Sequence, residues 1–510
     1  MKKLARLICI ILAALMLFSF ASCGENPGGE EGTSGETSSD NHEDESNVNR
    51  DYISDLASDV SFQGEDIRIL GLDKAGVNDE LKSEQSDSGN NVKDAVYARN
   101  RAIEDRLGIT FVVESNTDPM TTVDTTIKAG GPDAYQIYAD ATNNTVRSMV
   151  KGYFYDLSMV ENLDVEKKYW TQGFRDIASY GIEDKQYLIT GAPAISLYRY
   201  TFVTIFNRDY FEQAGWDDLY DTVNNMEWTL DYQFSLVTDV YTELDSKTGI
   251  SEGDFVGFIS GDTVSIDPYL TACGIHMIQK NSSGRWEFVG STQERFATMV
   301  EKIQQLYYDS NGTYIFSSAT KDDTGLTFIA DKFAAQEGAM ATVQLYALEQ
   351  SIGKIDFKYG IVPMPMFDTN QGRYYSYVQD QVTSFSILTC TPEADLPMLG
   401  AVLDLFAYES YNRVVPEYYE RSLSYKFIQD VESQEMLDII YESTEFDFVG
   451  AFSAVLPAVV RDDIRTVVAN KRGNVVGSTF SRWSRSLATN KQGGNGIDKA
   501  FNNLLDSFDY

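Results

Sequence analysis

From residue 67 onward, strand-like segments alternate with helix-like segments, and this alternation limits the possible folds more than any other feature of the chain. Residues 67–70 are strand-like, and residues 91–107 carry apolar side chains at helical spacing. Residues 109–113 and 134–139 are again strand-like, with a short helical segment between them. Such alternation predicts a mostly parallel sheet covered by helices on both faces.

Two loops of this predicted sheet carry polar side chains directly after a strand. Asp73 and Lys74 follow the first strand, and Asp140 and Asn143 follow the third. Loops after parallel strands gather at one edge of a sheet, and ligands bind there. We therefore expect ligand contacts at this edge. For Asp140 and Asn143, capping of the next helix is an equally good interpretation.

The second half of the chain repeats the alternating pattern. A helix is predicted after Trp228, with an apolar face that continues to Leu244, and residues 255–259 form a predicted strand. Residues 291–294 (Ser-Thr-Gln-Glu) have the spacing of a capping box that opens another helix. Trp228 itself is predicted to pack in the core, because it stands just before a helix.

Strand-like residues at 187–190 are interrupted by Gly-Ala-Pro and resume at 201–206. This interruption indicates a place where the chain crosses from one lobe to another, near 188–201. With 510 residues, the chain is too long for a single core and suits two lobes.

The chain is strongly acidic, with a formal net charge of -36. Nucleic acid and anionic lipid surfaces repel such a chain, so we exclude nucleic-acid partners. Only two histidines and four cysteines are present, which argues against a zinc site and leaves no metal expected. Cys273 and Cys390 are either a disulfide or two independent thiols, and their spacing does not decide between them.

The N-terminus has the features of a secretion signal. Three basic residues stand within the first six positions, residues 7–20 are almost entirely apolar, and small residues precede Cys23. The apolar run is shorter than the ~20 residues of a membrane-spanning helix, so an uncleaved anchor is the weaker interpretation.

This segment resembles a bacterial lipoprotein signal, in which cleavage precedes a cysteine that is then acylated. Phe20 occupies a position where such signals usually have leucine, and it is also large and apolar. The resemblance implies lipidation of Cys23. Residues 24–50 are mostly Gly, Ser, Thr, Asn, Glu and Asp, a composition typical of a disordered tether.

Six segments occur in the order found in one family. Together they resemble the core pattern of the family 1-like extracellular solute-binding proteins of carbohydrate ABC transporters, and they are 134–138, 152–158, 206–215, 333–341, 359–365 and 384–388. The likeness runs from about 67 to 411, and the chain beyond about 420 matches only loosely.

The resemblance implies an α/β fold of two lobes, like the type II periplasmic binding proteins, with a hinge between the lobes and a cleft that closes on the ligand. A second crossing is expected near 375–388. The expected divisions are a signal peptide (1–22), a lipidated cysteine and acidic tether (23–60), lobe 1 (61–195 and 381–435), lobe 2 (196–380) and C-terminal helices across the hinge and lobe 2 (436–510).

A sugar presents a ring of hydroxyls and two apolar faces, so its site needs aromatic platforms together with amides and carboxylates. The expected ligand-binding residues follow from their places at the predicted cleft: Asp73, Asp140, Asn143, Tyr198, Tyr200, Gln344, Tyr346, Tyr375, Tyr377, Asp380, Phe448 and Trp483. For any one of the aromatic residues, ordinary packing is the competing interpretation.

The resemblance further implies a monomeric, non-enzymatic protein without cofactors, held on the outer face of the cell membrane by its lipid. It would deliver a sugar or oligosaccharide to the permease subunits of an ABC transporter. Two alternatives stay open. One is an exported glycoside hydrolase, which needs two carboxylates about 5 to 9 Å apart, and the other is a glycan-docking lipoprotein that serves no permease.

Overall fold

The computed structural model describes residues 53–487 apart from 78, 85–87, 132–133, 182, 245, 283, 319–323, 420–430, 457–458 and 470–474. The predicted signal peptide, Cys23 and most of the predicted tether lie outside the described residues, as do residues 488–510. Within the described ranges, every helix is too short or too polar to cross a membrane.

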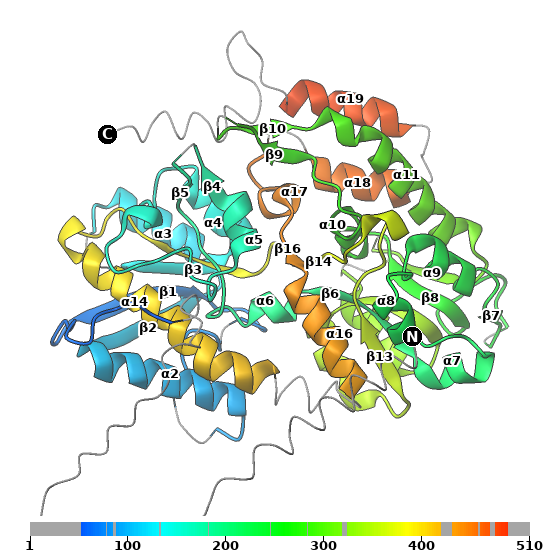
Figure 1. The fold of residues 1–510 in the computed structure, drawn as a ribbon, viewed down its shortest axis with the longest axis horizontal. Coiled ribbons are helices and arrows are strands. Elements are labelled where there is room, and N and C mark those ends of the chain that lie inside the picture. Colours follow the sequence, from blue (N-terminus) through cyan, green and yellow to red (C-terminus); the bar gives the residue numbers. More distant parts are fainter. Residues whose placement is uncertain are drawn as a thin grey trace, which may run out of the picture. The chain divides into compact units, whose positions relative to one another are not determined.

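The first sheet has four strands in the order β15-β3-β1-β2 (Figure 1). These strands are β1 (Asp66–Leu72), β2 (Thr110–Asn116), β3 (Ile137–Ala141) and β15 (Thr383–Ile387). β1 is parallel to both of its neighbours, as the alternating pattern predicts, whereas β15 runs antiparallel to β3. This sheet therefore contains three consecutive strands of the early chain and one strand that returns more than 200 residues later.

The second sheet follows the order β11-β8-β12-β6-β13, and β7 is added at β8. Its strands are β6 (Phe202–Asn207), β7 (Tyr241–Thr242), β8 (Phe255–Gly261), β11 (Thr313–Phe316), β12 (Gly338–Gln344) and β13 (Tyr359–Val362). The prediction of mostly parallel strands is wrong for this sheet. β6, which receives the chain from the first sheet, is antiparallel to both β12 and β13.

Short strand pairs complete the β-structure: β4 (Ser179–Tyr180) with β5 (Lys185–Gln186), β9 (Ile278–Lys280) with β10 (Trp286–Phe288), and β14 (Ser376–Tyr377) with β16 (Thr444–Glu445).

The helices of the first half are α2 (Asn91–Leu107), α3 (Pro119–Lys128), α4 (Thr142–Met149), α5 (Gln172–Ala178), α6 (Ser196–Arg199), α7 (Arg208–Ala214), α8 (Leu219–Asn224) and α9 (Leu230–Val237). Those of the second half are α10 (Pro268–Ala272), α11 (Gln293–Gln304), α12 (Leu326–Ala334), α13 (Leu345–Ser351), α14 (Leu396–Glu409), α16 (Val431–Glu442), α17 (Phe448–Ala451), α18 (Val460–Ala469) and α19 (Val476–Leu487). Among the C-terminal helices, α16 packs on β13, while α18 and α19 pack on α11 (Figure 1).

Local sequence signals set several of these boundaries. Gly108 and Gly215 end α2 and α7 in left-handed conformations, with φ of 70° and 69°, which glycine adopts without steric cost. The apolar positions of α2 predicted to share one face, including Val96 and Ile103, are fully buried. Trp228 is buried as predicted, and its indole N–H donates to the Pro363 carbonyl at 2.9 Å.

Three local predictions are wrong. The helix after Trp228 ends at Val237, because residues 241–242 leave it to pair with β8, and Leu244 is 63% exposed. The predicted capping box forms no side-chain cap, since the Thr292 hydroxyl donates to the Val289 carbonyl. The segment 187–190 is no continuous strand. Only Ile189 is bridged there, to Phe385 of β15.

The two cysteines of the described chain are free thiols, so the disulfide alternative is wrong. Cys273 is buried, and Cys390 is partly exposed.

The chain passes twice between the sheets, and the two passages lie side by side. The first lies between Ile189 and the start of β6, and the second lies between β14 and β15. They pair with each other at Thr201 and Val378.

Glu80 is buried against both passages. Its carboxylate accepts the backbone N–H of Ser196 on the first passage, and the Ser196 hydroxyl accepts the backbone N–H of Thr383 on the second at 3.0 Å. Glu80 is fully buried, and burial raises its pKa from 4.5 to about 7 despite hydrogen bonds and the charge of Arg199, which act in the opposite direction.

This burial makes the stability of the fold depend on pH. Because the folded pKa of Glu80 exceeds the unfolded pKa, its contribution to stability is fully present below pH 4.5 and is lost as the pH rises toward 7, by up to about 3 kcal/mol. We expect Glu80→Gln to remove this component, so that urea unfolding at pH 5 and pH 8 gives a smaller loss of stability in the variant. The exposed Glu294→Gln serves as the control and should follow the wild-type curve. Parallel pH curves for wild type and Glu80→Gln would contradict the assignment.

Candidate functional site

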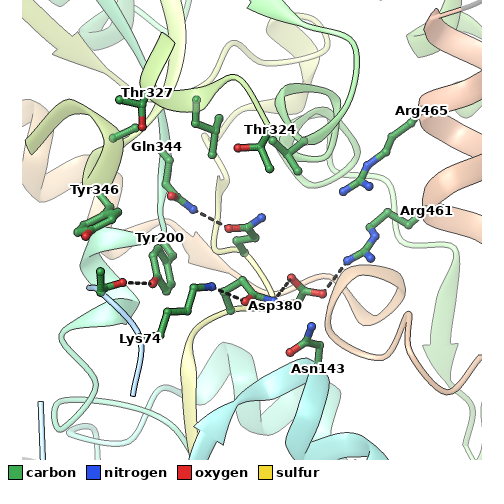
Figure 2. Close-up of a pocket in the computed structure, with 16 residues that line it drawn as sticks. Lys74, Asn143, Tyr200, Thr324, Thr327, Gln344, Tyr346, Asp380, Arg461 and Arg465 are labelled. Atoms are coloured by element: carbon green, nitrogen blue, oxygen red, sulfur yellow. Dashed lines mark hydrogen bonds and ion pairs between the residues drawn. The ribbon is translucent and has the colours of Figure 1, made fainter. Parts of the chain in front are cut away.

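A cavity of about 420 Å³ lies where the two sheets and the two passages meet (Figure 2). Its volume is within the range of small-molecule sites. The residues that line it are Lys74, Ala75, Asn143, Tyr200, Val264, Thr324, Leu326, Thr327, Gln344, Tyr346, Ala347, Gln379, Asp380, Gln381, Arg461 and Arg465.

Two lining residues follow strands of the first sheet, Lys74 in the loop after β1 and Asn143 in the first turn of α4 after β3. Each stands two residues beyond the end of its strand. The antiparallel pairing of β15 with β3 then places Asp380, three residues before β15, beside Asn143. The Asn143 backbone N–H donates to the Asp380 carbonyl at 3.1 Å.

The second sheet supplies an aromatic pair through the register of β6 and β12. Phe202, the first residue of β6, is paired with Gln344, the last residue of β12. Continuing this antiparallel register by two residues brings Tyr200 opposite Tyr346, and their ring centroids lie 6.0 Å apart in an edge-to-face arrangement. The two rings therefore stand on the same side of the cavity, where Figure 2 shows them together.

Side-chain amides form a polar layer across the cavity. The Gln344 amide group donates to the Gln379 side-chain carbonyl at 2.7 Å, and the Lys74 ammonium donates to Gln381 Oε1 at the same distance. Asn143 Oδ1 is buried, and among the described residues no donor reaches it. These groups are suited to bind ligand hydroxyls, because each can donate or accept a hydrogen bond.

Two arginines enter from α18, opposite the tyrosine pair (Figure 2). Arg461 and Arg465 are four residues apart and so share one helix face. Arg461 contacts the Asp380 carboxylate at 2.6 Å, and Arg465 Nε donates to Asp267 at 2.7 Å. Both carboxylates are nearly fully buried, with 3% and 4% exposed, whereas the arginine side chains are 26% and 18% exposed. Both arginines line the cavity, and each is already paired with a carboxylate that is more deeply buried than the arginine itself.

Burial and charge act against each other on these groups. Burial raises the pKa of Asp267, although Arg465 opposes the rise. Burial alone would lower the pKa of Arg461, but Asp380 and Asp267 raise it above its usual value. Burial lowers the pKa of Lys74, and the charges of Asp380 and Asp140 oppose this. Burial also raises the pKa of Tyr200, so its hydroxyl is protonated at neutral pH.

Five of the side chains predicted for the site line the cavity: Asn143, Tyr200, Gln344, Tyr346 and Asp380. The other seven lie elsewhere, each for a local reason.

Two polar residues predicted for the site are outside the cavity lining. Asp73 is exposed, and its backbone N–H donates to Asn116 at 2.7 Å. Asp140 is fully buried, and its carboxylate accepts hydrogen bonds from the Tyr138 hydroxyl and the Ala141 N–H, both at 2.6 Å. Helix α4 has no side-chain cap, so the capping interpretation is wrong for Asp140, whose carboxylate instead joins the end of β3 to the Asn144 side-chain amide of α4 at 3.2 Å.

Five aromatic residues predicted for the site pack against other rings. Tyr198 contacts Tyr441 edge-to-face, Tyr375 stacks with the Arg373 guanidinium, and Tyr377 packs on Phe202. Phe448 stacks on Phe452 at 4.4 Å. Trp483 is fully buried and donates to Asp463 at 2.8 Å. Aromatic character and nearness to a passage do not suffice to predict ligand contact, because a chain so rich in aromatic residues uses most of them for packing.

The sequence reasoning missed Arg461, Arg465, Gln379 and Gln381. The arginines had a weak signal, since they are four residues apart and so share a helix face, beside the apolar Ile464 and Val468. Only the tertiary packing of α18 beside the second passage shows that this face meets a cavity.

Among the described residues that line the cavity, Asp380 bears the only carboxylate, and this carboxylate forms an ion pair with Arg461. Over the same described ranges, no three His, Cys, Asp or Glu side chains gather in a way that could hold a metal ion.

The fold is similar to that of solved solute-binding proteins. A sugar transporter protein from Rhizobium etli in an open conformation has a TM-score of 0.52 at 14% identity, over 82% of this chain and 99% of that chain. An ABC substrate-binding protein from Listeria monocytogenes, in complex with cycloalternan, has a TM-score of 0.50 at 12% identity, over 83% and 99%. The galacto-N-biose-/lacto-N-biose I-binding protein from Bifidobacterium longum, in complex with lacto-N-biose, has a TM-score of 0.50 at 12% identity, over 88% and 96%.

These similarities confirm the predicted fold class, a two-lobed α/β solute-binding-protein fold. At such identities they show the fold alone. No family model and no curated protein sequence matches the chain.

The ion pair between Arg461 and Asp380 should stabilise the packing of α18 on the second passage. We expect Asp380→Asn to lower the free energy of unfolding by about 2 kcal/mol, less than the ~3–5 kcal/mol of a fully buried pair because Arg461 is 26% exposed. Asp462→Asn is the matched control, since Asp462 also contacts Arg461, at 3.8 Å, but is 62% exposed. Its effect should stay below about 0.5 kcal/mol. Urea unfolding measures both, and equal losses would show that burial of the pair is unimportant.

Proposed function

We propose that this protein is an extracellular substrate-binding lipoprotein of an ABC importer, which captures a sugar or oligosaccharide in the cavity and delivers it to the permease. The observation that carries the proposal is a single cavity lined by both sheets and both passages in a fold similar to solute-binding proteins. The proposal includes a monomer that binds without catalysis or cofactor and is anchored through acylated Cys23 on the outer face of the cell membrane.

The chemistry of the cavity supports a sugar ligand. Tyr200 and Tyr346 offer rings for the apolar face of a pyranose, and the amides of Gln344, Gln379 and Gln381 offer donors and acceptors for its hydroxyls. The named ligands of the similar structures, cycloalternan and lacto-N-biose, are both carbohydrates. Together these observations favour a carbohydrate over an apolar or peptide ligand.

The main alternative is a glycoside hydrolase, which needs two carboxylates on opposite sides of the scissile bond. Among the described residues that line the cavity, Asp380 is the only candidate, and its carboxylate is already paired with Arg461 at 2.6 Å. Incubation with oligosaccharides tests this alternative. Release of reducing ends would overturn the binding-protein proposal.

The second alternative is a glycan-docking lipoprotein that does not serve a permease. Solution scattering separates the two, because a ligand that contacts both lobes favours the arrangement in which they enclose it. We expect the radius of gyration to decrease when a ligand is added. An unchanged radius with bound ligand would favour docking.

The tyrosine pair provides the sharpest test of the site. We expect Tyr346→Ala to weaken binding about tenfold, or ~1.4 kcal/mol, because it removes one platform for the sugar face. Thermal stability without ligand should change by less than about 2 °C, since Tyr346 is partly exposed. A carbohydrate thermal-shift screen identifies the ligand to use, because a ligand that binds only the native state raises the melting temperature.

Tyr375→Ala is the matched control for this variant. Tyr375 is also partly exposed, but it lies beside Arg373 and His276 rather than at the cavity. Its removal should leave affinity unchanged. Equal affinity losses in the two variants, or a large loss of stability in Tyr346→Ala, would reassign Tyr346 to packing.

The anchor makes a separate prediction. In a bacterium that processes lipoproteins, we expect the wild type in the membrane fraction and Cys23→Ala in the soluble fraction, because the acyl chains supply the membrane affinity. Cys9→Ala is the control, since Cys9 lies in the segment expected to be removed. Retention of Cys23→Ala in the membrane would point to an uncleaved anchor.

A further inference from the structure

We propose that the sugar taken up by this site carries an anionic substituent, a carboxylate or a sulfate, which binds between Lys74 and the arginines of α18. The inference rests on the proposed function, because it names the chemical class of ligand for the same cavity. The composition of the chain alone would not predict an anionic ligand, because the formal net charge of the chain is -36.

The charges that reach the cavity surface are predominantly positive. Among the described residues that line it, three side chains are cationic, Lys74, Arg461 and Arg465, and one, Asp380, carries a carboxylate. Asp380 is almost completely covered, as is Asp267 behind Arg465. Both acidic groups are thus engaged by the arginines, and the cationic side chains are the more exposed members of these pairs.

Lys74 is the cation that lacks a carboxylate of its own. Its ammonium donates to Gln381 Oε1 at 2.7 Å, and no ion pair joins it to any carboxylate in the described part of the chain. Lys74 is exposed as a whole residue, although desolvation around its ammonium lowers the pKa, and Figure 2 shows the side chain reaching toward Asp380 from the side of Tyr200, opposite the arginines. Its amide partner is neutral, so the ammonium charge remains available to an anionic ligand.

A simpler role for Lys74 is to balance the buried acids around it. Asp380 and Asp140 are the carboxylates whose charges act most on Lys74. However, Asp140 is fully buried and holds hydrogen bonds from Tyr138, Ala141 and Asn144, and Asp380 is paired with Arg461. Each acid is thus already stabilised by closer groups. The two roles predict different results, because charge balancing would affect stability whereas ligand recognition would affect selectivity.

The experiment compares paired oligosaccharides by calorimetry with the purified chain. One pair is an oligogalacturonide and its methyl ester, and another is a sulfated galacto-oligosaccharide and its unsulfated form. We expect one acidic member to bind at least about tenfold more tightly than its neutral counterpart, with the difference shrinking at high salt. In Lys74→Gln this preference should fall to near zero while the melting temperature without ligand stays the same.

Lys82→Gln is the matched control, because Lys82 is an exposed lysine outside the cavity whose ammonium donates to the Val113 carbonyl. It should retain the preference. The uronate and sulfate pairs tell which anion the site takes.

The outcomes separate this inference from the proposed function. Equal binding of the neutral and acidic members, unaffected by Lys74→Gln, would overturn the inference and leave a sugar-binding protein. A fall in the melting temperature of Lys74→Gln with equal losses for both members would assign Lys74 to charge balancing and also overturn it. Failure of a broad carbohydrate panel, neutral and acidic, to bind or stabilise the wild type would overturn the proposed function as well.

Discussion

The antiparallel pairing of β6 with β12 is the interaction on which the cavity depends. In a sheet of parallel strands alone, the start of β6 would lie at the edge opposite the end of β12. Because the pairing is reversed, Phe202 at the start of one strand meets Gln344 at the end of the other, and Tyr200 and Tyr346 converge beyond them. The pairing of β15 with β3 does the same for Asp380 and Asn143 in the first sheet. Each passage between the sheets thus begins or ends at a ligand-facing edge.

The charged side chains at the ligand-facing edge determine which ligands the cavity can bind. Burying Asp267 and Asp380 would be costly without partners, and Arg461 and Arg465 supply those partners while remaining partly exposed. The arginines are consequently fixed in position before any ligand arrives, which reduces the entropy lost on binding. An acidic chain can therefore present an ordered cationic surface locally, since the buried carboxylates orient the cations rather than neutralise them at the surface.

Local signals predicted the framework better than the site. The alternating pattern predicted the first sheet, and the positions after β1 and β3 indicated Lys74 and Asn143, because strand order alone places them at one edge. Of the tyrosines predicted for the site, some line the cavity and others pack elsewhere. Tyr200 and Tyr346 line the cavity, whereas Tyr198, two residues away on the short helix α6, turns to the aromatic cluster of Tyr418 and Tyr441. Tyr198 lies within helix α6 and Tyr200 directly after it, so their side chains point in different directions, which a predicted crossing does not show. The arginines of α18 depend on long-range packing that no local pattern encodes.

Because residues from both sheets line the cavity, ligand binding is coupled to the arrangement of the two lobes. Lys74 and Asn143 follow strands of the first sheet, Gln344 and Tyr346 stand at and just after the end of β12 in the second, and Asp380 lies on a passage between the sheets. A ligand that contacts only one lobe would bind every arrangement of the lobes with equal affinity. It would therefore leave the populations of these arrangements unchanged. A sugar with its ring on the tyrosines and an anionic group at Lys74 would instead contact both sides, and its affinity would be greatest where both are within reach. Because Lys74 follows a strand of the first sheet and Tyr346 follows a strand of the second, a ligand that contacts both can favour one arrangement of the lobes.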